Sequence, residues 1–258
     1  MSWSAVVALA IGCHAPTPPT AAPPTTAAPA VVAPPPAEIG GVVVDDAGTA
    51  PRRPLRYQVA TGTQRHLRYQ ARNQGAAARE LELSWDYRFE RDGDRTWIAM
   101  TMGPTAQPVP AGIAGRWTLD PLGRHAPGTP DDQGRLVLRQ TQAELVLPIL
   151  PTAAIGVGAR WTVPIAMPGG PGVADLAGTI RWHLVALDGT RATLAGTVEV
   201  PAFELALGGQ PVTLVGHGAI EAWVDLAAYT ADGRMTLVIS DPGGDRRHSD
   251  IAIHLTSE

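Results

Sequence analysis

A histidine, a serine and an aspartate are consecutive near the end of the chain, as His248, Ser249 and Asp250. These are the side chains with which many hydrolases activate a serine hydroxyl as a nucleophile. Consecutive residues of a strand point to opposite faces, so the three cannot converge without partners from elsewhere in the chain. The sequence also lacks the G-x-S-x-G turn that presents such a serine. We therefore assign no catalytic residue and predict that the protein is not an enzyme.

Two further histidines, His183 and His217, could share a metal ion with a carboxylate. The chain has neither H-x-x-x-H nor H-E-x-x-H, the spacings that place two ligands on one helix face. The glycine-rich stretches 167–172 and 241–245 match neither a phosphate loop nor an EF-hand, and we expect a loop and a turn there. We predict no metal site and no cofactor.

The composition excludes several other mechanisms. All 20 basic residues are arginine, so a Walker-type phosphate loop and a lysine Schiff base are both impossible. A single cysteine excludes intrachain disulfides and cysteine-based zinc sites. The net charge of −4 gives no electrostatic reason to expect nucleic-acid binding.

Cys13 is that single cysteine, and it follows the uncharged apolar run 5–12. This run is shorter than the roughly 20 residues that cross a bilayer, but it has the length of a signal-peptide core. Residues 9–12, Leu-Ala-Ile-Gly, resemble the lipobox of bacterial lipoproteins. Leu9 is one place further from the cysteine than in the usual pattern, and residues 1–4 lack a basic side chain. The resemblance implies removal of residues 1–12 and lipidation of Cys13. The alternative is a buried N-terminal strand with a free thiol.

A proline-rich segment follows the cysteine. Residues 14–38 contain nine prolines and eight alanines, too little apolar surface to fold, and they favour an extended conformation. We expect residues 13–38 to form a disordered tether and residues 39–258 to form the folded domain. The resemblance to lipoproteins also implies outer-membrane localisation, because His14 replaces the aspartate associated with inner-membrane retention. The domain would face the periplasm or the cell surface.

The rest of the chain shows the pattern of a β protein. Apolar and polar residues alternate without a break over residues 80–90, which predicts a half-buried strand. Asp92-Gly93 and Asp188-Gly189 predict hairpin turns. Asp232-Gly233 gives a similar turn signal, and Gly216 and Gly218 predict a bend or bulge. Further strands are expected at 55–61, 65–72, 95–102, 116–120, 159–167, 178–187, 190–200, 210–228, 234–240 and 248–256.

These segments predict a mainly β fold with one antiparallel domain of roughly ten strands. The architecture is either a curved sheet or half-barrel, or a sandwich. Residues 139–150 could form a short helix or another strand.

The stretch 150–163 contains Gly156, Gly158 and Trp161 in a G-x-G-x-x-W pattern and is followed by strands linked through Asp-Gly. This arrangement resembles a family of uncharacterised bacterial lipoproteins, and loosely the LolA/LppX type of curved sheet. The resemblance implies a half-barrel with an apolar hollow that could carry a lipid or another amphipathic molecule.

Charged residues separate into two blocks. Residues 52–79 hold seven arginines and no acidic residue, whereas residues 80–94 hold six acidic residues. The arginines could form a basic face for phosphate or lipid headgroups. They could instead pair across neighbouring strands, because His66, Arg68 and Arg72 share one strand face.

Six tryptophans follow the tether, and most are expected in the core. Trp161, Trp182 and Trp223 are the candidates for lining an open ligand cavity. Our first hypothesis is a lipid-anchored envelope protein with a non-catalytic binding or structural domain. The partners would then be the membrane, through the anchor, and an amphipathic small molecule or an envelope component. A carrier of an amphipathic ligand and an envelope hydrolase are the alternatives.

Overall fold

The computed structural model describes residues 41–73, 79–103, 114–127, 147–167, 176–207, 210–244 and 246–257. They form one sheet of twelve antiparallel strands in the order β1-β7-β8-β9-β10-β11-β12-β2-β3-β4-β5-β6. The strands are β1 (Val43–Asp46), β2 (Gln64–Asn73), β3 (Arg79–Asp92), β4 (Arg95–Met102), β5 (Ala114–Leu119), β6 (His125–Pro127), β7 (Arg160–Met167), β8 (Leu176–Asp188), β9 (Arg191–Leu207), β10 (Gln210–Asp225), β11 (Thr230–Ser240) and β12 (Arg247–Ser257). The mainly β, antiparallel fold is confirmed, and the described residues contain no helix.

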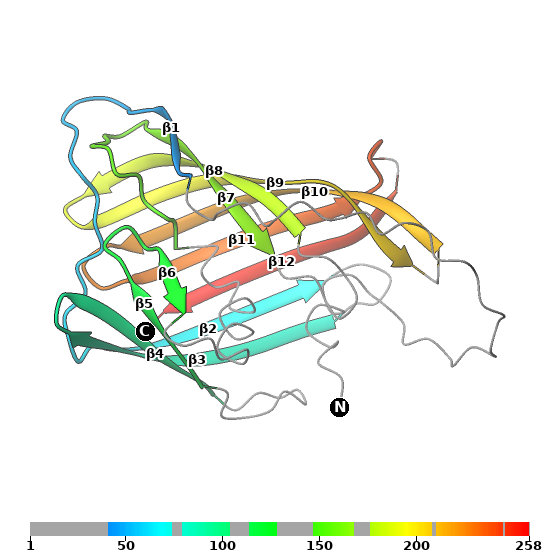
Figure 1. The fold of residues 1–258 in the computed structure, drawn as a ribbon. Coiled ribbons are helices and arrows are strands. Elements are labelled where there is room, and N and C mark those ends of the chain that lie inside the picture. The colour runs from blue at the N-terminus through cyan, green and yellow to red at the C-terminus, as the bar shows by residue number, and fades with distance from the viewer. Residues whose placement is uncertain are drawn as a thin grey trace, which may run out of the picture.

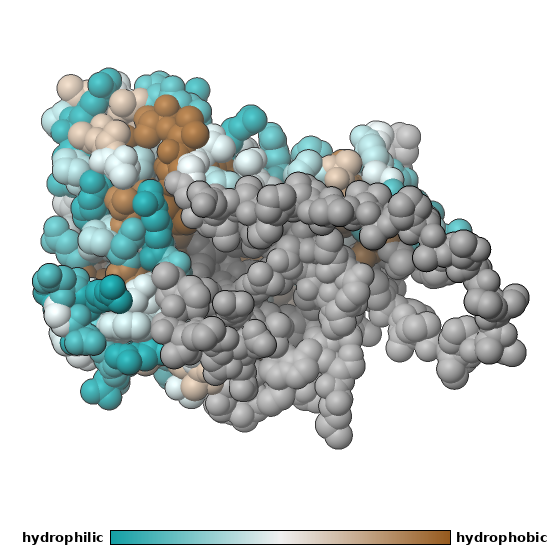
Figure 2. All heavy atoms as spheres, viewed as in Figure 1, coloured by the Kyte–Doolittle hydropathy of each residue, from teal (hydrophilic) through white to brown (hydrophobic). Residues whose placement is uncertain are grey.

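The sheet is strongly curved and does not close into a barrel (Figure 1). Its two edge strands, β1 and β6, each pair with a single neighbour. Both edges are short, which leaves few unpaired backbone groups for another strand to join. Apolar surface gathers near β1 and β7 and is bordered by polar residues (Figure 2). We call the face that carries the buried side chains the concave face, and the opposite one the outer face.

The alternation in β3 determines which side chains enter the core. Trp85, Tyr87 and Phe89 are buried on the concave face, whereas Glu82 and Asp86 are exposed on the outer face. The predicted alternation is therefore confirmed. The same period of two runs through β9 to β12, so the concave face is apolar from strand to strand.

Two of the three predicted turns are confirmed. Gly93 and Gly189 have φ angles of 57° and 55°, as the hairpin turns require. The third prediction is wrong, because Asp232-Gly233 lies inside β11. The β10–β11 connection lies at 226–229, where Tyr229 itself has a φ of 52°. Its buried ring packs edge-on to Tyr57 with the ring centroids 4.9 Å apart, which holds this uncommon conformation in place.

Residues 55–61 do not form the expected strand, although Leu55 and Tyr57 are buried. They cross one end of the sheet, from β1 at its edge to β2 in its interior (Figure 1). Their backbone therefore bonds to turns instead of a strand ladder. The amide of Tyr57 donates to the Pro121 carbonyl at 2.8 Å, and that of Gln58 donates to Leu226 at 2.9 Å.

The glycines of β10 produce the expected irregularity. The β9–β10 register shifts between Leu214 and Gly216. A Cβ at Gly216 would lie 3.0 Å from Val200 and 3.1 Å from Ile239, so a side chain there would crowd both neighbouring strands. The predicted bulge is confirmed.

Residues 147–155 contact both ends of the sheet, near β5 on one side and β7 on the other. The amide of Leu150 donates to Leu122 at 2.8 Å, just after β5, and Nε1 of Trp161 on β7 donates to Ile149 at 3.0 Å. Gly156 and Gly158 then turn the chain into β7; Gly158 has a φ of 87°. The part of the predicted helix or strand at 139–150 that is described, residues 147–150, has no regular secondary structure, and residues 139–146 lie outside the described ranges.

Candidate functional site

The three candidate tryptophans do not line one cavity. Trp161 and Trp182 are direct cross-strand neighbours on the concave face, and each is at most 1% exposed. Trp223 is 49% exposed and lies on the outer face. The prediction that groups the three is corrected: two are core residues, and the third belongs to a separate surface.

Packing and alternation explain this division. Gly196 lies opposite Trp182 in β9, and a Cβ there would approach its ring to 3.1 Å, so glycine makes room for the indole. In β10, Ala222 and Val224 are buried on the concave face. Trp223 lies between them in the sequence and must point outward.

The concave face carries an aromatic wall on β2, β3 and β5. Tyr69 packs edge-on against Trp85 with the ring centroids 5.8 Å apart, and Tyr87 packs in the same way against Trp117 at 6.2 Å. The Nε1 atoms of Trp85 and Trp117 are buried and have no hydrogen-bond partner among the described residues. A buried donor without an acceptor costs about 1–3 kcal/mol, so these two groups require an explanation. Strand alternation predicts the face of each tryptophan, but not whether its N–H finds an acceptor.

A second aromatic group closes the end of the sheet crossed by residues 55–61. Nε2 of His125 and the hydroxyl of Tyr229 are 2.8 Å apart, and the Tyr57 hydroxyl donates to the Pro148 carbonyl at 2.9 Å. Burial raises the pKa of the Tyr57 and Tyr69 phenols far above the usual value. Both phenols, Tyr57 in this group and Tyr69 in the aromatic wall, therefore keep their protons at physiological pH.

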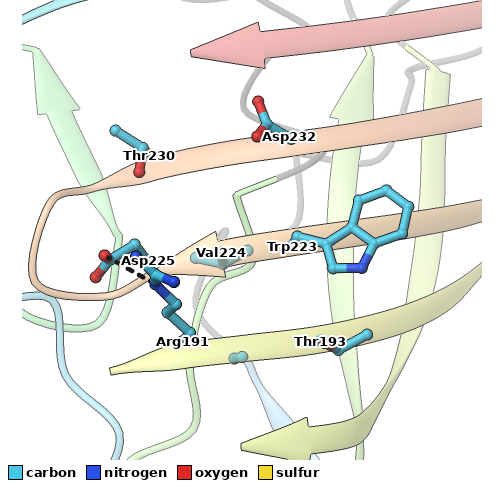
Figure 3. Close-up of a pocket in the computed structure, with 8 residues that line it drawn as sticks. Arg191, Thr193, Trp223, Val224, Asp225, Thr230 and Asp232 are labelled. Carbon is cyan, nitrogen blue, oxygen red and sulfur yellow. Dashed lines mark ion pairs between the residues drawn. The ribbon is translucent and has the colours of Figure 1, made fainter. Parts of the chain in front are cut away.

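The outer face has a pocket of about 430 Å³ near the turns that end β8 and β10. Trp223 and Asp232 line it together with the ion pair of Arg191 and Asp225, whose charged atoms are 3.9 Å apart (Figure 3). Thr193 and Thr230 complete its polar rim. Of the residues that line this pocket, only Trp223 is among the candidates from the sequence. The alternation of Ile220, Ala222 and Val224 with polar residues is the sequence pattern that indicates an outward-facing indole at position 223.

Part of the arginine-rich block, Arg68 and Arg72, pairs with acidic residues across strands, as one of the two hypotheses predicts, whereas its other described side chains, Arg52, Arg53, Arg56 and Arg65, donate to backbone carbonyls. His66 and Asp86 are directly opposite, with Nδ1 and Oδ1 2.9 Å apart, and Nε of Arg68 is 3.6 Å from Glu82. Arg72 forms an ion pair with Glu80. The pairs are exposed on the outer face, so each contributes little to stability.

The histidine–serine–aspartate run is not assembled into a triad. Ser249 is 2% exposed on the concave face, whereas the neighbouring His248 points away from it. Nε2 of His248 is 2.6 Å from Oδ1 of Asp241. Asp250 pairs with Arg247 at 3.8 Å. The structure thus keeps the three side chains apart.

The other candidates are also separated. His217 lies opposite Glu199, while His183 lies opposite Arg160 and Ala195. The described ranges contain no group of three or more metal-ligating side chains. Residues 241–244, the described part of the stretch 241–245, form a turn in which the Gly244 amide donates to the Asp241 carbonyl at 2.8 Å. Cys13, the tether and most of 167–172 lie outside the described ranges.

Comparison with protein-family models, curated proteins and solved structures gives no match. In the part of the chain that the structure describes, no helix has the length and hydropathy of a membrane span. The resemblance to a lipoprotein family therefore stays a prediction from the sequence.

Proposed function

We propose that this chain is a lipid-anchored protein of the bacterial cell envelope whose β domain binds an amphipathic molecule without catalysing a reaction. The anchor part of the proposal rests on Cys13 and the proline-rich tether. The binding part rests on the concave face and on the two unpartnered indole N–H groups that it carries.

An open sheet with one apolar face must cover that face with another layer. Among the described residues, the segments that cross the concave side gather at one end of the strands (Figure 1). One is the segment between β1 and β2, and the other is residues 147–155. Each of them bonds to the loop after β5, through Tyr57 and Leu150 respectively. The apolar side chains along the rest of the strands, such as Leu237, Ile239 and Ile251, are buried, and we propose that the hydrocarbon part of a ligand packs among them.

The two indoles indicate which polar group such a ligand carries. Indole Nε1 is a donor only, so Trp85 and Trp117 require acceptor oxygens. A molecule with an apolar chain and carbonyl or carboxylate oxygens, as in an acyl ester or a fatty acid, supplies both features. The buried donors at Trp85 and Trp117 are the observation that carries the proposal.

Oleic acid is the probe that tests this binding. The full chain with Cys13→Ser, freed of bound lipid, is titrated calorimetrically with oleic acid, with and without the double substitution Trp85→Phe and Trp117→Phe. We expect one saturable site, weakened about tenfold or more in the double variant. Each lost hydrogen bond accounts for about 0.5–1.5 kcal/mol, and 1.4 kcal/mol is a factor of ten.

Trp97 provides a matched control. Its Nε1 also has no partner among the described residues, but the ring lies on the outer face beneath Arg116, whose guanidinium carbon is 4.4 Å from the ring centroid. Trp97→Phe should leave oleic acid binding unchanged. Absence of saturable binding, or equal weakening by the control, contradicts the proposal.

A further inference from the structure

We propose that the outer-face pocket around Trp223 is a binding site for the ring of a neutral sugar. Its volume of about 430 Å³ lies within the roughly 300–1,000 Å³ typical of small-molecule sites. The site is independent of the concave face, because β10 directs Trp223 to the outside and its neighbours Ala222 and Val224 to the inside.

The exposed indole supplies the apolar part of the site. Trp223 is one of only four large apolar side chains exposed among the described residues, and it is the only aromatic one of them. Its ring is seen nearly face-on, between Thr193 on β9 and Asp232 on β11 (Figure 3). A sugar ring has a face of C–H groups that can stack on such a ring, which buries apolar surface on both partners.

Polar residues lie beside Trp223 in two rows set by the sheet register. Thr193, Trp223 and Asp232 lie directly opposite one another on three adjacent strands. Directly opposite positions have Cβ atoms about 4.5–5.5 Å apart, so both polar side chains are within reach of a ligand on the indole. Arg191 and Thr230 flank Asp225 in the next row.

The pocket lining carries charges of both signs, the Arg191 guanidinium and the carboxylates of Asp225 and Asp232, so hydrogen-bond donors and acceptors lie side by side. A sugar hydroxyl both donates and accepts a hydrogen bond, so it can satisfy carboxylates, a guanidinium and threonine hydroxyls together. This mixture of donors and acceptors beside an apolar ring face is the chemistry of carbohydrate recognition.

The end of the pocket is held in place by two turns. Oδ1 of Asp225 accepts hydrogen bonds from Thr190 Oγ1 at 3.0 Å and from the Ala227 amide at 2.9 Å. The Leu226 amide donates to the Thr190 carbonyl at 2.9 Å, which joins the β8–β9 turn to the β10–β11 turn. A site held in its shape before binding loses less entropy when the ligand arrives.

The probes are the tetramers of glucose and of N-acetylglucosamine, titrated into the full chain and followed by ligand NMR. We expect at least one tetramer to bind, and Trp223→Ala to weaken that binding at least tenfold. Thr193→Val and Asp232→Asn should weaken it several-fold. Val185→Ala is the control, because Val185 is 45% exposed and does not line the pocket. Since Trp223 is half exposed, its substitution should leave the thermal unfolding midpoint nearly unchanged.

The proposal is overturned if neither tetramer binds, if Trp223→Ala binds as tightly as the wild type, or if Val185→Ala loses as much affinity as Trp223→Ala. Preferential binding of choline over both tetramers identifies a cation site and overturns it as well. The Trp85→Phe/Trp117→Phe variant should keep its sugar binding, and Trp223→Ala should keep its oleic acid binding. The two proposals can therefore fail separately.

Discussion

Trp161 lies directly across from Trp182 in the register of β7 and β8, and both indoles are buried against the core. Nε1 of Trp161 donates to the Ile149 carbonyl at 3.0 Å, which fastens the 147–155 segment to β7. Trp85 is equally buried but has no acceptor among the described residues. Trp161 therefore fastens a connecting segment to the sheet, whereas the Nε1 donor of Trp85 is one of the two that we propose a ligand satisfies.

This contrast predicts different costs for the same substitution in the absence of ligand. Trp161→Phe leaves the partly buried Ile149 carbonyl without its donor, whereas Trp85→Phe removes an unpaired donor. Because the loss of ring volume is the same, the difference in unfolding free energy reports the hydrogen bond. We expect Trp161→Phe to be less stable by about 1–2 kcal/mol than Trp85→Phe in urea denaturation. Equal stability of the two variants contradicts this assignment.

Gly156 fixes the entry into β7. A Cβ at this position would lie 1.9 Å from the Thr49 carbonyl oxygen, so the backbone must shift to admit alanine. Gly156→Ala should lower the unfolding free energy by about 1–3 kcal/mol. Gly41→Ala is the control, because no atom lies within 4 Å of the added Cβ, and its effect should stay within about 0.5 kcal/mol. A stable Gly156→Ala variant would mean that this junction is not close-packed.

Alkaline pH should destabilise the domain through its buried tyrosines. Burial raises the pKa of Tyr57 and Tyr69 above the value of about 10 of an exposed phenol. Their contribution is fully present below pH 10. Above it the unfolded chain releases phenolic protons that the native state retains, so stability falls by up to about 1.4 kcal/mol per pH unit for each group. Denaturation curves at increasing pH should show this slope, reduced in Tyr57→Phe. Reversible ionisation of both phenols near pH 10 in the folded state would refute the assignment.

The proposed lipid anchor predicts the behaviour of one substitution. Cys13→Ser removes the only thiol in the chain and with it the proposed attachment point for acyl groups. Labelled palmitate fed to the host should enter the wild type and be absent from the variant, which should move to the soluble fraction. The wild-type chain should also begin at Cys13. Equal labelling of both forms would disprove the anchor.

Local patterns in the sequence were sufficient for part of the fold. The alternation in residues 80–90 predicts the faces of β3 because side chains on a strand repeat every two residues. Gly93 and Gly189 predict their hairpins because those turns need positive φ angles. The pairing of His66 with Asp86 follows once β2 and β3 are neighbours.

Long-range arrangements could not be predicted in the same way. No local pattern shows that β12 pairs with β2, or that residues 55–61 bond to distant turns. The Asp232-Gly233 turn signal was misleading because a four-residue connection closed by Tyr229 comes earlier in the chain. For the site, the outward direction of Trp223 was readable from its neighbours Ala222 and Val224. The missing acceptors of Trp85 and Trp117 depend on packing and have no sequence signal.

The most direct test of the account compares the native and denatured masses of the full chain purified from the membranes of its host. We predict a denatured mass equal to residues 13–258 plus covalent acyl groups, and a native mass larger by one apolar, oxygen-bearing molecule that organic solvent releases. A denatured mass that matches the unmodified chain starting at Met1, together with an identical native mass, would contradict both the anchor and the ligand.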